Sequence, residues 1–177
     1  MVQTVGIFEK VSFEQYLTAI KDLFYKDVEL TENIIEQVRQ IWENIKIPTR
    51  ATKGSTGYDF KAPYYIELAP GETVKVPTGI RVRIVDGWWL GCFPRSGLGF
   101  KYRLQLDNTV GVIDSDYSRS DNEGHIFAKI TNDGHEDKVL KINTGDGFMQ
   151  GIFIPYGITY DDHVDTVRNG GMGSTGK

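Results

Sequence analysis

Residues 80–99 read IRVRIVDGWWLGCFPRSGLG, and they decide the fold class. Over residues 80–84 apolar side chains alternate with two arginines, so an extended segment would have one apolar and one charged face. This period of two predicts a half-buried β-strand. An apolar run over 88–93 predicts a second strand, and Pro94 and Gly97 mark the turn that follows it.

Glycine and proline divide the chain into two parts. Of the 20 glycines only Gly6 precedes residue 47, and all six prolines follow it. Since both residue types mark turns, we expect a helical first part and a turn-rich β fold after it. Further strands are predicted over 125–131, 139–142 and 151–154. Short strands with frequent turns are typical of an antiparallel barrel or jelly roll.

The first part contains two amphipathic helix patterns. Ser12 and Gln15 form the pattern of a capping box, and Thr31 is suited to be a second N-cap. Apolar residues follow each cap at helical spacing, on one face: Phe13, Tyr16, Leu17, Ile20 and Phe24, then Ile34, Val38, Ile41, Trp42 and Ile45. Two short helices cannot bury such faces alone, so we expect them to pack on each other and on the main domain or a partner chain.

Composition excludes several classes of protein. The 177 residues suit one ordinary domain, and a net charge of −4 argues against broad binding to nucleic acid. No apolar run approaches the roughly 20 residues that span a bilayer. The N-terminus lacks the features of a signal peptide. The single Cys92 allows no intrachain disulfide, and we expect a cytoplasmic protein without membrane or nucleic-acid partners.

Two segments carry residues suited to catalysis. Pro94–Gly99 combines an arginine, a hydroxyl and flexible backbone amides, which suit a phosphate; the alternative is a β-turn with a surface arginine. Val110–Tyr117 places Asp114 after a short apolar run, where a carboxylate can act as a general base on water. The alternative there is an acidic hairpin loop. A calcium loop is excluded, because Arg119 and His125 stand where that motif needs glycine and glutamate.

Three further patterns are less specific. Residues 171–177 match the start of a phosphate-binding P-loop, but no parallel βαβ unit precedes them, so we expect no NTPase of that kind. Their amides suit phosphate oxygens, and the alternative is a disordered tail. Residues 57–60 and 145–151 are turn-to-strand transitions with a polar group that could face a site. The histidines and Cys92 lack the spacing of a zinc site.

Taken in order, five segments resemble the motifs of the trimeric dUTPase family, of the bacterial or phage type. The resemblance covers about residues 45–177, and the second and third motifs are its most specific parts. The segments are residues 57–62, 94–99, 111–117, 145–150 and 168–176.

The resemblance implies a mainly β fold, a distorted jelly-roll β-barrel assembled as a homotrimer with shared active sites. It implies hydrolysis of dUTP to dUMP and pyrophosphate with Mg²⁺. The expected division of the chain is an N-terminal helical extension over 1–46, the barrel over 47–160 and a flexible glycine-rich arm over 161–177.

The resemblance also implies roles for single residues. Asp114 would be the general base, Tyr117 would pack against the deoxyribose and thereby reject UTP, and Asp59 would lie near the magnesium. Asn108, Val110, Gly111, Val112 and Ile113 would read the uracil edge. Phosphate oxygens would bind Arg95, Ser96, Gly97 and Gln150, and in the arm Arg168, Gly173, Ser174 and Thr175, with Met172 over the uracil.

Three departures from the family pattern stand out. Met172 occupies the position of a phenylalanine that stacks on uracil, and Gly147 that of a frequent arginine. The stretch over 118–125 is longer than usual, so His125 or Phe127 is a candidate for the missing aromatic.

Two other functions compete with this interpretation. A dCTP deaminase, which has a homologous fold, needs a glutamate on the strand after the third motif, and residues 125–132 contain none. A regulatory module would use residues 12–45 to bind a protein partner. If these helices are instead a structural addition, removing residues 1–44 should leave hydrolysis nearly intact.

Overall fold

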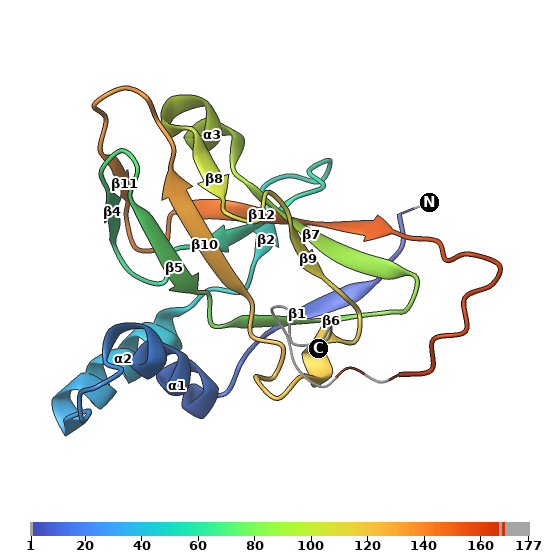
Figure 1. The fold of residues 1–177 in the computed structure, drawn as a ribbon, viewed down its shortest axis with the longest axis horizontal. Coiled ribbons are helices and arrows are strands. Elements are labelled where there is room, and N and C mark those ends of the chain that lie inside the picture. Colours follow the sequence, from blue (N-terminus) through green and yellow to red (C-terminus); the bar gives the residue numbers. More distant parts are fainter. Residues whose placement is uncertain (1, 167, 169–177) are drawn as a thin grey trace.

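The computed structural model describes residues 2–166 and 168. The described chain is mainly β, which confirms the expected fold class, and its strands pair antiparallel in four sheets (Figure 1). None of the helices in these residues is long and apolar enough to cross a membrane.

The largest of the four sheets has five strands, with the long strand β12 at its centre (Figure 1). Its order is β2 (Thr49–Arg50), β3 (Tyr58–Lys61), β12 (Gly147–Pro155), β7 (Trp88–Pro94) and β9 (Gly111–Ile113). The apolar run over 88–93 therefore forms β7 as predicted, while β12 extends beyond the expected 151–154 at both ends.

Three smaller sheets complete the β fold around one core. They are β5 (Thr73–Pro77), β10 (Phe127–Asn132) and β8 (Leu104–Leu106); β11 (Leu140–Ile142) with β4 (Ile66–Leu68); and β1 (Gly6–Lys10) with β6 (Ile80–Ile84). The alternation over 80–84 behaves as predicted, because Ile80 and Val82 are buried and Arg83 is exposed. Leu90, Ile130 and Phe148 are fully buried between the sheets.

Both predicted helices form at the predicted caps. Helix α1 spans Phe13–Phe24 and α2 spans Glu32–Asn44. The Ser12 hydroxyl accepts from the Gln15 N–H at 3.1 Å, and the Thr31 hydroxyl accepts from the Ile34 N–H at 3.4 Å.

The helices pack on each other and on the β domain, as expected (Figure 1). Tyr16 is fully buried, and Val38 of α2 belongs to the same core as the strands. Trp42 adds a polar connection, because its Nε1 donates to the Val11 carbonyl at 2.9 Å.

Strand β1 was not foreseen by the sequence analysis, which expected only helices before residue 47. Residues 6–10 pair with β6, and the Phe8 ring meets the Phe60 ring edge-on at 5.7 Å. The helices therefore lie between two strands of the β fold, β1 and β2, and form an insertion rather than an appendage at the end of the chain.

Candidate active site

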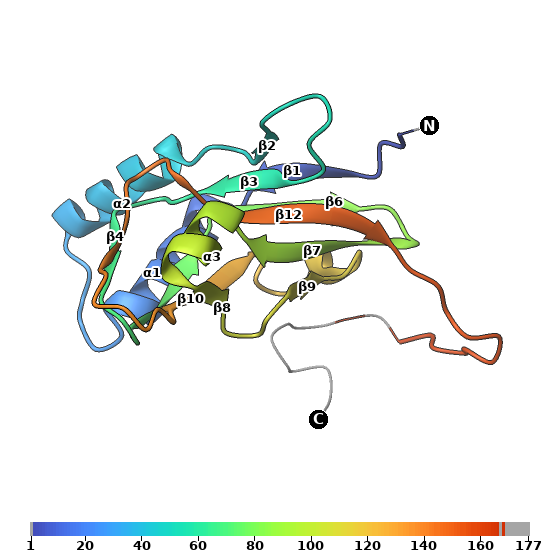
Figure 2. The same cartoon turned by 90° about the horizontal axis from the view of Figure 1, so that it is seen from above.

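The first group of expected site residues gathers where β3, β12 and β7 run side by side (Figure 2). Asp59 of β3 lies opposite Gln150 of β12, which in turn lies opposite Phe93 of β7. Asp59, Arg95, Ser96 and Gln150 line one cavity of about 290 Å³. Sequence positions 59, 95 and 150 are thus brought together by strand pairing.

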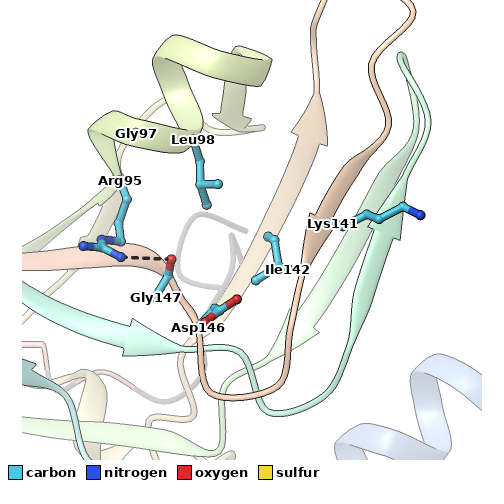
Figure 3. Close-up of a pocket in the computed structure, with 7 residues that line it drawn as sticks. All are labelled: Arg95, Gly97, Leu98, Lys141, Ile142, Asp146 and Gly147. Atoms are coloured by element: carbon cyan, nitrogen blue, oxygen red, sulfur yellow. Dashed lines mark hydrogen bonds between the residues drawn. The ribbon is translucent and has the colours of Figure 1, made fainter.

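Arg95 is the central cation of this group. Its Nε lies 3.1 Å from Asp59 Oδ1, and its Nη1 donates to the Gly147 carbonyl at 3.4 Å. Figure 3 shows Arg95 beside a second cavity of about 280 Å³, lined also by Gly97, Leu98, Lys141, Ile142, Asp146 and Gly147. Arg95 therefore lines both cavities, while its guanidinium donates to the Gly147 carbonyl (Figure 3).

Backbone amides add to this positive region. Arg95 is the N-cap of helix α3 (Ser96–Tyr102), and its carbonyl accepts the N–H groups of Leu98 and Gly99 at 3.1 and 2.9 Å. The N–H groups of Ser96 and Gly97 are the ones that helix geometry leaves for a ligand. This arrangement suits phosphate oxygens.

Two glycines, whose roles the sequence analysis missed, make room for these side chains. A Cβ on Gly57 would lie 2.4 Å from Gln150 Oε1, and one on Gly147 would lie 2.7 Å from Arg95 Nη1. Any side chain at either position would displace the neighbouring polar group. Gly147, which departs from the family pattern, thus leaves the space that the Arg95 side chain occupies.

The second group follows β9. Asp114 comes directly after this strand and forms an ion pair with Arg168 Nη2, while Arg168 Nε lies 2.9 Å from Asp116 Oδ1. A cavity of about 700 Å³ is lined by Asp86, Trp89, Val112, Asp114, Ser115, Asp116, Tyr156, Val164, Thr166 and Arg168. Arg168, expected to bind phosphates, therefore covers the expected base of its own chain.

Tyr117 lies behind the same arginine. The Arg168 guanidinium carbon is 5.8 Å from the Tyr117 ring centroid, and the tyrosine is only 6% exposed. Burial raises the pKa of Tyr117, against the lowering effects of Asn122 and Arg168. The hydroxyl is thus neutral, and neighbouring groups cover nearly all of the side chain in the single chain.

The expected uracil-reading residues lie in a tight turn and the strand after it. The Thr109 N–H donates to the Leu106 carbonyl and the Val110 N–H to that of Asn108, at 2.8 and 2.7 Å, with Thr109 at a φ of 66°. Gly111 pairs with Cys92 of β7, and a Cβ on it would lie 3.0 Å from the Cys92 Cβ. The turn is therefore closely fixed against the sheet.

The two groups lie at opposite ends of β7. Ile113 pairs with Leu90 in the antiparallel register, so Asp114 lies near position 89 of β7. Position 89 is six residues before Arg95. At about 3.3 Å a residue this is a separation of about 20 Å along the strand. One chain therefore does not place Asp114 and Arg95 around the same phosphate group.

His125 and Met172 were both expected as residues that cover the uracil ring. His125 is fully buried, where its Nε2 accepts from the Gly79 N–H at 2.9 Å, so it does not cover a ligand here. Met172, Gly173, Ser174 and Thr175 lie outside the described residues.

No group of three or more His, Cys, Asp or Glu side chains suited to a metal ion occurs in residues 2–166 and 168. Asp59 offers one carboxylate, already paired with Arg95. The described residues alone thus form no cage for a cation. They fit an ion that is held mainly by phosphate oxygens and water, as Mg²⁺ prefers.

Comparison with known proteins gives one consistent family. The dUTPase family model matches residues 43–176. The deoxyuridine 5'-triphosphate nucleotidohydrolase of Lactococcus lactis is 41% identical over 135 residues, which cover 75% of this chain and 89% of the relative. That of Photorhabdus laumondii is 36% identical over 146 residues, covering 78% and 91%.

Solved structures give the same result. The dUTPase of Streptococcus mutans is 39% identical with a TM-score of 0.57, over 66% of this chain and 90% of that one. The dUTPase of phage phi11 of S. aureus shares the fold at 24% identity and a TM-score of 0.57, over 70% and 92%. On these matches, and on motif residues that the fold gathers into two polar sites, the chain belongs to the dUTPase family.

Proposed function

We propose that this chain hydrolyses dUTP to dUMP and pyrophosphate as a homotrimer, in active sites that combine residues of different subunits. The observation that carries the proposal is the separation of its two polar groups. Asp114 and Arg95 lie about 20 Å apart along β7, so a single phosphate chain reaches both only if they come from different copies. Closed rings of identical chains supply such pairings by symmetry.

Asp114 acts as the general base in this proposal. Its carboxylate orients a water molecule and takes its proton as the oxygen attacks the α-phosphorus. The bond from this phosphorus to the bridging oxygen breaks, and pyrophosphate leaves with the electron pair. Substrate binding requires Arg168 to release Asp114, and the freed guanidinium is then available to the phosphates.

The other group binds the triphosphate. Arg95 lines both cavities, Gly97 lines one of them, and Ser96 and Gln150 line the other. The guanidinium, the two backbone amides and the Gln150 side-chain amide supply hydrogen-bond donors. Asp59 would hold Mg²⁺ through a water molecule, and the ion would neutralise part of the charge of the triphosphate. A related phage dUTPase coordinates a structural Mg(II) ion.

Tyr117 and the turn before β9 select the nucleotide. The apolar Tyr117 ring packs on the deoxyribose, where a 2′-hydroxyl would lose its solvation. The backbone over 108–113 reads the uracil edge. We expect its tight turn, closed by hydrogen bonds from the Thr109 and Val110 N–H groups, to exclude a thymine methyl group. The single buried Cys92 needs no oxidising compartment, which supports a cytoplasmic site of action.

Pyrophosphate release from dUTP, dCTP, dTTP and UTP tests the proposal, first in magnesium and then in excess chelator. We expect fast release from dUTP alone, lost with chelator. Ammonia released from dCTP would instead indicate a deaminase. No release from any of the four, by a folded trimer that binds dUTP, would favour a regulatory module that uses residues 12–45 for a protein partner.

A further inference from the structure

The loop over 118–126 holds the hydroxyl of Tyr117 at two points. This hydroxyl donates to the His125 carbonyl at 2.9 Å and accepts from Asn122 Nδ2 at 2.9 Å. The two partners flank Glu123 and Gly124 in the loop. A shift of the loop therefore moves the tyrosine ring with it.

Glu123 joins this loop to the helical insertion. Its Oε2 accepts from the Ser12 N–H at 2.8 Å, and its Oε1 accepts from the Ser12 hydroxyl at 2.5 Å. The same hydroxyl accepts from the Gln15 N–H at the start of α1. Since the hydroxyl has one proton and gives it to Glu123, its lone pair faces Gln15. One serine thus caps α1 and holds the loop.

This contact replaces half of an ordinary capping box. The sequence pattern predicts that the Gln15 side chain returns to the Ser12 N–H. In the structure the Ser12 N–H donates instead to the carboxylate of Glu123, which is 111 residues away in sequence. Partial burial raises the pKa of Glu123, but the two Ser12 hydrogen bonds and the nearby Arg81 and His125 lower it overall. The carboxylate is thus held ionised, as an acceptor of both bonds.

The backbone at this point is unusual for a glutamate. Glu123 has a φ of 58° and Gly124 a φ of 72°, so two successive residues are left-handed. A Cβ on Gly124 would lie 2.6 Å from the Ser118 Cα, which explains the glycine. Non-glycine residues keep this conformation where surrounding contacts demand it. At Glu123 these contacts include the two side-chain hydrogen bonds to Ser12 and the backbone bond that its N–H donates to the Ser120 carbonyl at 2.8 Å.

The flanks of the loop are fixed to the β fold. Arg81 Nη2 of β6 donates to the Ser118 carbonyl at 3.0 Å, and the Gly79 N–H donates to His125 Nε2. The His125 ring lies 6.1 Å from the ring of Tyr16 in α1. Between these anchors, Ser12 supports the middle of the loop, beside the residues that hold Tyr117.

We propose that Glu123 is a positioning residue for sugar selection, and that through its two bonds to Ser12 the helical insertion helps to hold Tyr117 in the orientation that rejects ribonucleotides. The inference rests on the proposed contact of Tyr117 with the deoxyribose. It assigns a role in specificity to a segment outside the family motifs.

Steady-state kinetics on the full-length protein test this role. The readout is the ratio of kcat/KM for dUTP to kcat/KM for UTP, in wild type, Ser12→Ala and Glu123→Gln. Losing a hydrogen bond of this kind is worth about a factor of ten, so we expect the ratio to fall about ten-fold in each variant, with the KM for dUTP raised more than kcat is lowered. Ser12→Thr keeps the hydroxyl and should retain the wild-type ratio.

Thr31→Ala is the matched control. It removes the corresponding cap of α2, whose hydroxyl accepts from the Ile34 N–H and has no part in the loop. We expect it to lower helix stability like Ser12→Ala but to leave the ratio unchanged. An equal loss of selectivity in both alanine variants would overturn the inference, since selectivity would then follow stability alone.

Hydrogen exchange of the free protein gives a readout independent of catalysis. Amides over 117–125 should exchange faster in Ser12→Ala and Glu123→Gln than in wild type and Thr31→Ala. Unchanged exchange together with an unchanged ratio would refute the role of Glu123 while leaving the hydrolase assignment intact. A wild type that does not release pyrophosphate from dUTP would instead refute the proposed function itself.

Discussion

The carboxylate of Glu123 accepts both the backbone N–H and the hydroxyl of Ser12, across 111 residues of sequence. The contact joins the loop after Tyr117 to the first turn of α1. The insertion is therefore part of the folded unit, because β1 precedes it in the β fold and Tyr16 fills the core beneath it.

Removing residues 1–44 should accordingly yield insoluble or unfolded protein, contrary to what a surface addition predicts. The deletion takes away β1 and uncovers the buried apolar surface that Phe13, Tyr16 and Ile20 cover. Circular dichroism and size-exclusion chromatography of the truncated protein check this. A soluble, active product would mean that the β domain folds without its first strand.

Asp114→Asn should keep dUTP binding and lower kcat by at least about a hundred-fold, the scale of a lost general base. The amide has nearly the same shape but does not take a proton from water. Calorimetric titration and turnover measured on the same preparation separate the two effects. Asp86→Asn is the control, because Asp86 lines the same cavity and binds the Ser115 hydroxyl at 3.1 Å without a proposed role in catalysis. Near-normal turnover of Asp114→Asn would remove it from the mechanism.

Mixed trimers test the shared site. Arg95→Ala and Asp114→Asn chains should each be inactive alone, since every site lacks one group. When they are co-expressed, random assembly gives sites with both residues intact in about one case of four. We expect about a quarter of the wild-type activity from the mixture. If one chain supplied both residues to a site, the mixture would stay as inactive as its parts.

His125 should make stability depend on pH below neutrality. Burial lowers the pKa of His125 from 6.5 to about 4, and the nearby Lys75 acts in the same direction. The negative charge of Glu123 raises this pKa, but by less than burial lowers it. The unfolded chain therefore takes up this proton first, so the stabilisation is complete above pH 6.5 and is lost as the pH falls towards 4. The difference of about 2.5 pH units corresponds to roughly 3 kcal/mol.

Urea unfolding at fixed protein concentration between pH 7 and 4 measures this loss. His125→Gln retains an acceptor for the Gly79 N–H but does not titrate, so its stability should fall less over the same range. Parallel pH profiles for the two proteins would show that other groups cause the loss.

Tyr16→Phe should stabilise the protein by roughly 1 kcal/mol. The Tyr16 hydroxyl is buried without a hydrogen-bond partner among the described residues, and burial, with Tyr64 nearby, raises its pKa strongly. Phenylalanine has no hydroxyl, so the folded state no longer includes the unfavourable free energy of burying this group without a hydrogen bond. Tyr65→Phe is the control, because Tyr65 is exposed and its hydroxyl donates to Glu67. A lower melting temperature of Tyr16→Phe relative to this control would point to an undetected partner.

Sequence alone determined the local structure of this protein. The alternation over 80–84, the caps Ser12 and Thr31 and the helical faces behind them all formed as predicted. Each depends on interactions within a few residues, such as a hydroxyl that accepts an N–H three positions later. The motif segments likewise identified the family, whose model matches residues 43–176.

Tertiary structure alone decided how these parts meet. The segment 6–10 is too short for its hydrophobic pattern to predict a strand. It forms β1 because it pairs with β6. The Gln15 pattern predicted the wrong partner for the Ser12 N–H, which donates to the charged carboxylate of Glu123 at 2.8 Å. Strand register, which places Asp114 and Arg95 at opposite ends of β7, depends on pairing between distant segments. Long-range pairing leaves no signal in local spacing, so only the fold shows how far apart these two residues lie in one chain.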